Sequence, residues 1–330
     1  MPVKLDGRVH ATFTSNPATL RSACQNPNLQ QLPRPTNELA SIIRNLITAS
    51  PGNILYARDF SGIEAVLVGY DAAAPNYIRL ARRDVHTYYT AYALNELEPG
   101  RIPANDLPLL SWDDGKLFTR LSELKRELKK ERNSLYKHLV HAANYMQSAK
   151  GAKEKIFAET GVEFDVSRVK RVMDIYFELF PEIRQWHTNV LLQAEKDGYL
   201  RNAFGYLHRF SHVFDYEKVD GKWVKTPSHD VANKVIAFGP QSNAAAIIKL
   251  AMLILYENHF ELVGQFLRLL IHDELLFDVP ESKVDIVDQI CQTVMESNIK
   301  ELPLPESYGL GPYLSILTES KQGPRWASMK

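Results

Sequence analysis

The stretch "RLLIHDELLFDVP" (residues 268–280) places three polar residues between two apolar runs. The runs 267–271 and 275–279 have the length and composition of buried strands, so we predict a hairpin here. His272-Asp273-Glu274 would form its tip, where polar side chains must be solvated, paired or held against a charged ligand. Such a triplet is usually a solvated turn. No Gly, Asn or Pro occupies this turn, however, so turn chemistry does not explain the three residues.

A second predicted strand, over 54–60, also ends on an acid, Asp59. If this strand and the hairpin share a sheet, Asp59 and Asp273 can lie side by side. Two close carboxylates repel unless a proton or a divalent cation lies between them. Two metal ions held by two carboxylates are one way to catalyse in-line phosphoryl transfer. Spacing alone leaves this open, because an acid at the end of a strand is usually a cap or a solvated turn residue.

The bulk composition is that of an ordinary globular protein. The chain has 330 residues, 45% hydrophobic and 24% charged, with a formal net charge of zero. Charge is uneven, however, because residues 116–155 hold 11 Lys/Arg and 4 Asp/Glu, a local charge of +7. That run is either a solvated helix face or a surface that follows phosphates. Two cysteines, no apolar signal core and no run near the ~20 residues of a membrane span predict an intracellular protein without a membrane.

The order of predicted elements indicates an α+β fold, because strands at both ends of the chain enclose a long helical block. This block, 76–197, is predicted to be a separate lobe inserted between the sheet-forming ends. A loop is predicted at 98–114 and a coil tail at the end of the chain. Asp197-Gly198 and Asp220-Gly221 are predicted as hairpin turns. The predicted helices are 63–70, 76–95, 117–145, 166–197, 232–258 and one near 282–300.

Six stretches, in order along the chain, resemble the family A DNA polymerases of the bacterial DNA polymerase I type. The resemblance covers nearly the whole chain and implies a right-hand fold with an antiparallel palm sheet, flanking helices and an inserted, mostly helical fingers subdomain. It implies palm at 1–75, fingers at 76–198 and palm again at 199–330. The stretches are "LRSACQNPNLQQLP" (20–33), "DFSGIE" (59–64), "RRDVH" (82–86), "KHLVHAANYMQS" (137–148), "FGPQSNAAAIIKLAM" (238–252) and "IHDELLFDVP" (271–280).

The resemblance also implies roles for the acids. Asp59 and Asp273 match the family's two metal-binding aspartates, and Glu274 belongs to the same catalytic motif. Two Mg²⁺ ions, which Mn²⁺ can replace, would bridge them, the primer 3′-hydroxyl and the incoming triphosphate. The backbone carbonyl of Phe60 is a further implied metal ligand. The expected activity is therefore template-directed DNA synthesis from deoxynucleoside triphosphates on primer-template DNA.

Three residues of the matching fingers helix, Lys137, His141 and Tyr145, are spaced i, i+4, i+8 and so share one helix face. By resemblance, Lys137 holds the triphosphate, His141 contacts the sugar and Tyr145 stacks near the templating base. Glu64, hydrogen-bonded to Tyr145, matches the acid that occupies the place of a ribose 2′-oxygen. That pair implies selection of deoxynucleotides over ribonucleotides.

One departure affects the phosphate contacts. The family has an Arg four residues before the Lys, but this chain has Asn133 there and Arg132 five residues before. Five residues turn an α-helix by about 500°, which would take Arg132 off the Lys137 face. Its long side chain could still reach a phosphate, or Arg126 or Lys129 could substitute. His86, in the family's Asp-x-His segment, is a second implied phosphate contact.

The residues that match primer-template contacts of the family would bind DNA without reading its sequence, because minor-groove acceptors lie at similar positions in all base pairs. Met146 stands where Gly is usual, which is expected to stiffen the end of the fingers helix. The implied DNA-binding residues are Arg21, Asn28, Gln30, Gln241 and His272.

Other interpretations stay open. The chain matches no thumb and shows no proofreading acids, so the resemblance implies the catalytic part of a split or truncated family A enzyme. We expect no 3′→5′ exonuclease activity and a second polypeptide that supplies the thumb, the exonuclease or both. A single-subunit RNA polymerase shares palm carboxylates, although Glu64 and Tyr145 argue against it. A non-catalytic, polymerase-like DNA-binding subunit would not need both aspartates and Lys137. A reverse transcriptase is less favoured, since these residues do not reveal the template.

Overall fold

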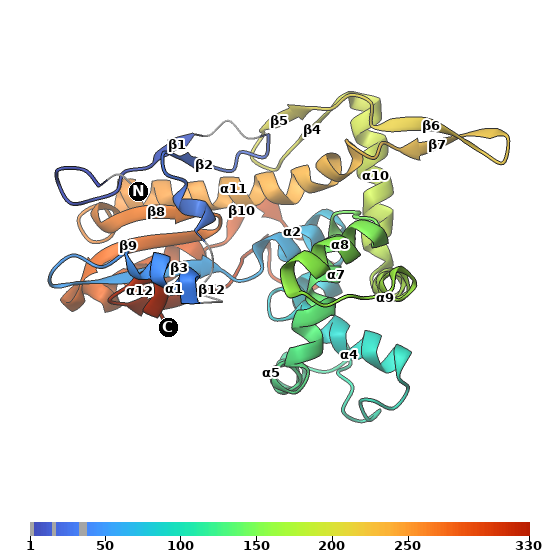
Figure 1. Ribbon diagram of the computed structural model, residues 1–330, viewed down its shortest axis with the longest axis horizontal. Coiled ribbons are helices and arrows are strands. Elements are labelled where there is room, and N and C mark those ends of the chain that lie inside the picture. Colours follow the sequence, from blue (N-terminus) through green and yellow to red (C-terminus); the bar gives the residue numbers. More distant parts are fainter. Residues whose placement is uncertain (1–2, 15–17, 33–37) are drawn as a thin grey trace. The chain divides into compact units, whose positions relative to one another are not determined.

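The computed structural model describes residues 3–14, 18–32 and 38–330 (Figure 1). The chain divides into two compact units. The first joins the two ends of the chain, Met1–Ile63 and Gln241–Lys330, and the second is Glu64–Pro240. These units are defined by contacts, whereas the subdomain boundaries at 75/76 and 198/199 are functional divisions and stay predictions. Pro33, the last residue of the first matching stretch, lies outside the described residues.

The first unit is built on a four-stranded antiparallel sheet in the order β12-β3-β9-β8 (Figure 1). β3 (Asn53–Phe60) and β9 (Glu274–Pro280) are its central strands, with β8 (Leu267–Ile271) and β12 (Thr318–Gly323) at the edges. The predicted strand and hairpin therefore share one sheet, which confirms the condition on which the carboxylate argument depends.

Alternation along β3 gives the sheet two different faces. Leu55 and Ala57 point to one face, where they form a core cluster with Leu276 from β9, Cys24 and Leu29 from the N-terminal segment and Trp326 near the C-terminus. Asp59 follows on this same face. Tyr56 and Arg58 point to the other face, where helix α12 (Val284–Met295) supplies Asp288 as their hydrogen-bond and ion-pair partner.

The predicted coil tail is wrong, because it contains the edge strand β12. β12 pairs with β3 over Thr318 to Gly323. Its sequence, "TESKQG", lacks the apolar alternation that marks a strand, so only the pairing reveals it. The helix predicted near 282–300 ends at Met295. The remaining regular elements that begin and end in this unit are β1 (Thr12–Thr14), β2 (Ala23–Gln25), α1 (Glu38–Asn45), β10 (Ile299–Pro303) and β11 (Tyr313–Leu314).

The second unit is mostly helical, as the sequence predicted for the block after residue 76. Tyr77, Asn144 and Tyr176 are buried at its centre and linked by hydrogen bonds, which satisfies their polar atoms. Its helices are α2 (Ile63–Asp71), α3 (Pro75–Ala81), α4 (Val85–Leu97), α5 (Asp114–Glu127), α6 (Lys129–Glu131), α7 (Lys137–Asn144), α8 (Ala149–Thr160), α9 (Val166–Leu179) and α10 (Pro181–Asp197).

Three predicted helices are interrupted. The helix predicted over 117–145 comprises α5, α6, a π-helical turn and α7. The helix predicted over 76–95 breaks before α4 because Asp84 caps it, accepting the Thr87 backbone N–H at 3.0 Å. The helix predicted over 166–197 breaks at Phe180, since Pro181 begins a new helix at its first turn. Helix α8 was not predicted.

Of the two predicted hairpin turns, only Asp220-Gly221 is confirmed. It joins β6 (Phe214–Val219) to β7 (Lys222–Pro227). Gly198 instead ends α10 in the left-handed conformation, with a φ of 69°. The hairpin that follows it pairs β4 (Tyr199–Arg201) with β5 (Leu207–Arg209).

Helix α11 (Ala232–Asn258), predicted over 232–258, contributes residues to both units. It is the one helix of the described residues that length and composition alone would allow to cross a membrane. Of its most apolar window, 56% is buried inside the structure, and Ser242 and Asn243 are buried within it. These are properties of a core helix.

Candidate active site

The tip of the β8–β9 hairpin is a two-residue turn, His272-Asp273, between the paired residues Ile271 and Glu274. His272 has a φ of 58°, in the left-handed region where glycine is usual. The backbone N–H of Phe60 donates to the carbonyl of Asp273 at 3.3 Å. This hydrogen bond ties the turn to the end of β3, so Asp273 and Asp59 come from neighbouring chain segments of the same sheet.

Asp59 lies in an acidic, desolvated environment. Glu274 sits directly opposite it in the β3–β9 register. Burial, followed by the charges of Asp273 and Glu274, raises the pKa of Asp59 to about 7. Burial likewise raises the pKa of Asp273, against the lowering effect of His272 and Arg21. Asp59 Oδ1 is buried and has no hydrogen-bond partner.

A cation from β12 partly balances this cluster. Lys321 Nζ forms an ion pair with Glu274 Oε2. Lys321 lies on β12, directly opposite Ala57 of β3, whereas Glu274 lies one strand further, on β9. The small Ala57 side chain lets the lysine extend across β3. Glu319, opposite Asp59 on β12, adds a further negative charge. Sequence reasoning missed both residues because it placed them in a coil tail.

The residues present fit a divalent cation. No group of three or more His, Cys, Asp or Glu side chains forms a ready metal site among the described residues. Nevertheless, Asp59 and Asp273 offer carboxylate oxygens, the ligands that Mg²⁺ prefers. A cation between the two carboxylates would lower their raised pKa values and give the unpartnered Asp59 oxygen a ligand to bind.

The second unit holds the residues that match the nucleotide-binding helix. Lys137 and His141 are exposed on α7, one turn apart, and the His141 and Tyr145 rings meet edge to face with centroids 4.9 Å apart. Tyr145 Oη donates a hydrogen bond to Glu64 Oε2, from the first turn of α2. The structure therefore brings Glu64 and Tyr145 together, as the resemblance implied.

The helix before Lys137 is not a regular α-helix, which corrects the argument about Arg132. Residues Arg132–Tyr136 form a π-helical turn, in which the Lys137 backbone N–H donates to the Arg132 carbonyl. A π turn holds one residue more than an α turn. The five-residue separation of Arg132 and Lys137 is therefore one turn, and the assumed 3.6 residues per turn was wrong at this position.

Arg132 is held by the end of another helix. Its guanidinium donates to both carboxylate oxygens of Asp84, at 3.0 and 3.2 Å, and to the Thr87 hydroxyl at 2.9 Å. Burial alone would raise the pKa of Asp84, but Arg132, His86 and Thr87 outweigh it and lower the pKa. Asp84 therefore holds the Arg132 side chain in place, a contact that sequence reasoning missed although Asp84 lies inside the matching "RRDVH" stretch.

His86 lies in the first turn of α4, two residues after Asp84. Burial lowers its pKa to about 3, so the ring is neutral at physiological pH. Its Nδ1 atom is buried without a hydrogen-bond partner. A neutral imidazole carries one N–H, which can donate a hydrogen bond to a phosphate oxygen.

The end of α7 is fixed by a Schellman motif. Met146 has a φ of 56°, and its N–H donates to Ala143 while that of Gln147 donates to Ala142. The Asn233 amide, turned to satisfy both of its polar atoms, donates to the carbonyls of Tyr145 and Met146. These bonds fix the backbone at Tyr145 even though Met replaces the usual Gly.

The implied DNA-binding residues all belong to the first unit. The Asn28 side chain accepts the Gln30 N–H at 3.1 Å, and Gln30 Nε2 donates to the Leu270 carbonyl of β8 at 3.0 Å. Arg21 acts electrostatically on Asp273, as described above. Gln241 is half-buried on α11 and His272 is exposed in its turn. The carboxylate cluster thus shares its unit with the implied DNA contacts, whereas the implied nucleotide contacts lie in the other unit.

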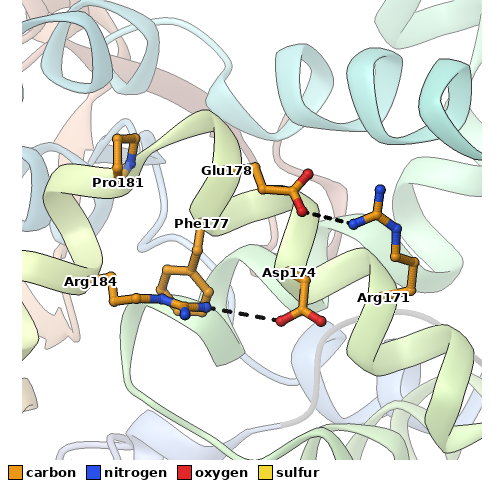
Figure 2. Close-up of a pocket in the computed structure, with 6 residues that line it drawn as sticks. All are labelled: Arg171, Asp174, Phe177, Glu178, Pro181 and Arg184. Carbon is orange, nitrogen blue, oxygen red and sulfur yellow. Dashed lines mark hydrogen bonds and ion pairs between the residues drawn. The ribbon is translucent and has the colours of Figure 1, made fainter.

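A surface pocket between α9 and α10 is unrelated to these residues (Figure 2). It has a volume of about 360 Å³. Its two arginines are balanced by acids: Arg171 pairs with Glu178 at 2.8 Å, and Arg184 approaches Asp174 at 3.9 Å while lying over the Phe177 ring. The pocket therefore offers an anion little unbalanced positive charge.

The chain is similar to bacterial DNA polymerases along almost its whole length. It is 27% identical over 309 residues to a thermostable DNA polymerase I of Thermus aquaticus, covering 92% of this chain and 32% of that protein. It is 27% identical over 330 residues to a DNA polymerase I of Chloroflexus aurantiacus, covering 98% of this chain and 29% of the relative. The chain thus spans about a third of the length of these relatives.

A solved structure shares the fold. The polymerase domain of Pol1 from M. smegmatis, described in complex with DNA primer-template and dNTP, matches 99% of this chain and 49% of its own with a TM-score of 0.69 and 23% identity. The likeness confirms the predicted α+β polymerase fold. The predicted second polypeptide has no support in these comparisons and stays a prediction. The model of DNA polymerase family A matches residues 119–316, more than half of the chain, so the chain belongs to this family.

Proposed function

We propose that the chain carries out template-directed DNA synthesis, adding deoxynucleotides to a primer 3′-hydroxyl. The observation that carries the proposal is the pair of desolvated carboxylates, Asp59 and Asp273, held together by a hydrogen bond between the β8–β9 turn and β3. Such acids destabilise a fold unless they bind something positive. Primer-template DNA and deoxynucleoside triphosphates, which accompany the M. smegmatis structure, are the proposed ligands, and an intracellular location fits them.

In the reaction, the primer 3′-oxygen forms a bond to the α-phosphorus and the bond to the leaving pyrophosphate breaks, while the 3′-hydroxyl proton passes to solvent water. Asp59, Asp273 and the Phe60 carbonyl would hold two Mg²⁺ ions, which lower the pKa of the attacking hydroxyl and neutralise charge on the leaving group when bound. Glu274, which is paired with Lys321, would place a further carboxylate beside Asp59.

The second unit would bind the nucleotide. Lys137 would supply a positive charge to the triphosphate, and Arg132, one turn before it and held by Asp84, would add a guanidinium N–H donor. Neutral His86 would supply a further N–H donor. Asp84 orients the Arg132 fork by its two-point contact. Glu64, fixed by Tyr145, would exclude the 2′-hydroxyl, and His141 would contact the sugar.

Primer extension by the purified chain, with Mg²⁺ and four deoxynucleotides, tests the proposal. We expect Asp59→Asn and Asp273→Asn each to reduce the rate by at least about a hundredfold while primer-template binding persists. Asp285→Asn is the matched control, because this exposed acid lies on α12, against the other face of the sheet. Full activity in either active-site variant would refute the proposal, as would binding without extension by the wild-type chain.

A further inference from the structure

The hairpin of β6 and β7 separates its side chains sharply between two faces. In its register Phe214 lies opposite Pro227, Tyr216 opposite Lys225 and Lys218 opposite Trp223, and residues opposite each other share a face. We call this face, with those six residues, the aromatic face. The other face carries the acids Asp215 and Glu217, with Lys222, Val224 and Thr226.

The aromatic face exposes side chains that folding alone does not explain. Trp223 is 71% and Tyr216 66% exposed, in a hairpin that Figure 1 shows extending beyond α10 within the second unit. A two-stranded hairpin is marginally stable by itself, and large exposed aromatic side chains gathered on one face mark interaction sites. Tyr and Trp suit such sites because each combines a flat apolar ring with a polar group.

At the open end of the hairpin, the aromatic-face residues already have partners within the protein. Lys225 forms an ion pair of 2.6 Å with Glu195 of α10, and its ammonium lies 4.5 Å from the centre of the Phe214 ring. At the other end, Asp220 and Gly221 both have positive φ, 49° and 83°, the pattern of a tight hairpin turn. Between these two ends, Tyr216, Lys218 and Trp223 form the outer part of the aromatic face.

Charge indicates which ligand this outer surface fits. The aromatic face has no acid of its own, and its two lysines are Lys225, which is paired with Glu195, and Lys218. The opposite face holds two acids and one lysine. A polyanion therefore approaches the aromatic face more favourably than the other. Flat rings beside lysines are how proteins bind single-stranded nucleic acid, since bases stack on the rings and cations follow the phosphates.

We propose that the aromatic face binds a single strand of nucleic acid, with bases stacked on Tyr216 and Trp223 and a phosphate near Lys218. The two rings are diagonal neighbours, about 7–8 Å apart at their backbones, so each takes a separate base. Given the proposed function, on which this identification rests, the ligand is the unpaired template strand. Because stacking is independent of base identity, the site does not select a sequence.

The experiment compares two DNA ligands with the full chain. Fluorescence anisotropy measures the Kd for a labelled primer-template with an unpaired template overhang and for a blunt duplex of the same paired length. We expect Trp223→Ala to weaken binding of the overhang DNA about 5- to 100-fold and to leave the blunt duplex unchanged. Val224→Ala, the adjacent exposed residue on the opposite face, is the matched control and should change neither.

A second pair of variants tests charge with the same substitution, Lys to Ala, on each face of the hairpin. Lys218→Ala and Lys222→Ala remove one lysine each, from opposite faces of the same hairpin. We expect only Lys218→Ala to weaken overhang binding and to make the negative slope of log K against log salt shallower by about 0.7. Trp223→Phe, which keeps a ring, should restore most of the affinity lost in Trp223→Ala.

Equal effects of Trp223→Ala and Val224→Ala, or equal effects on both DNA ligands, would overturn the proposal and leave the aromatic face to a protein partner. This failure is distinct from failure of the proposed function. If only the single-strand site is wrong, the wild-type chain still extends primers. If the proposed function is wrong, the wild-type chain does not extend primers, but the binding comparison can still be made.

Discussion

At the scale of single residues, Asp59 differs strongly from an exposed acid. It is flanked in the sheet by Glu274 and Glu319, and one of its oxygens is buried without a partner. Lys321 is the compensating charge that the structure provides, and it is used by Glu274. Glu64 shows the opposite case, because a neutral donor, Tyr145, fixes a half-buried carboxylate in one orientation.

The pKa of Asp59 predicts a pH-dependent stability. Its folded pKa, about 7, exceeds its ordinary value of 3.8, so the folded state keeps the proton that the unfolded state loses between these pH values, and stability falls as pH rises through this window. We expect the difference in free energy of unfolding between Asp59→Asn and the wild type to shift in favour of the variant between pH 4 and pH 8. The shift should be at most about 4 kcal/mol. Thermal unfolding in metal-free buffer measures this.

Asp285→Asn, at an exposed position, should show no such pH-dependent difference. Added Mg²⁺ should raise the melting temperature of the wild type at pH 8 more than that of Asp59→Asn, because only the folded wild type has both carboxylates. A gain that is the same at both pH values would contradict the assigned pKa.

Sugar selection is expected to depend on Glu64. Replacing it by Ala removes the carboxylate from the place proposed for the 2′-hydroxyl, so ribonucleotide incorporation should rise at least about tenfold relative to deoxynucleotide incorporation. Tyr145→Phe keeps the ring but removes the hydrogen bond, and a smaller change in the same direction is expected. The measurement is kcat/KM for each nucleotide in single-nucleotide extension. Unchanged selectivity in Glu64→Ala would remove this role.

At the scale of elements, the π-helical turn Arg132–Tyr136 accommodates a side chain that an α-helix would turn away. The extra residue brings Arg132 to one turn before Lys137, where Asp84 at the cap of α4 meets its guanidinium. A π turn commonly marks a functional site because its poorer backbone geometry must be offset by specific contacts. Here the contact is a buried ion pair with 11% and 9% of the two side chains exposed.

Breaking this pair should be costly on either side. We expect Arg132→Ala to lower the free energy of unfolding by about 3–5 kcal/mol, because the buried Asp84 would lose its guanidinium partner. Among the described residues, Asp84 would keep only Thr87 and the more distant Lys125, at 3.7 Å. Asp84→Asn with Arg132→Ala should cost less than the sum of the single variants in a double-mutant cycle. Arg171→Ala is the control, since its pair with Glu178 is 48% and 58% exposed and contributes below about 1 kcal/mol. Additive losses would show that the pair does not couple.

At the scale of the whole molecule, both ends of the chain build the first unit. The core cluster beneath Asp59 takes Cys24 and Leu29 from the beginning, Ala57 from β3 and Trp326 from the end. β12 reaches β3 from more than 250 residues away. The long helical segment between them forms the second unit. The carboxylate cluster therefore depends on contacts that form only when distant segments meet.

The two tryptophans 223 and 326 test this dependence. Trp326 is 3% exposed and Trp223 is 71% exposed. Trp326→Ala should lower the free energy of unfolding by about 3–5 kcal/mol, since it leaves a large cavity beside β3. Trp223→Ala should change it by less than about 0.5 kcal/mol. Thermal or denaturant unfolding compares them, and equal losses would show that the C-terminal segment is not part of the core.

The sequence by itself determined the local features of this protein. Apolar runs beside acidic residues marked β3, β8 and β9, and the order of six short stretches identified the family resemblance and the Glu64–Tyr145 pair. These features are readable because each is a pattern over a few neighbouring residues.

Only the tertiary structure decided the remaining contacts. "TESKQG" becomes a strand because β3 offers it an edge, and Lys321 reaches the acids across Ala57 only in that register. The π turn at Arg132 is selected by Asp84, which lies 48 residues earlier. Local propensity does not encode such partners, since the free energy that selects them comes from pairing and burial between segments far apart in the chain.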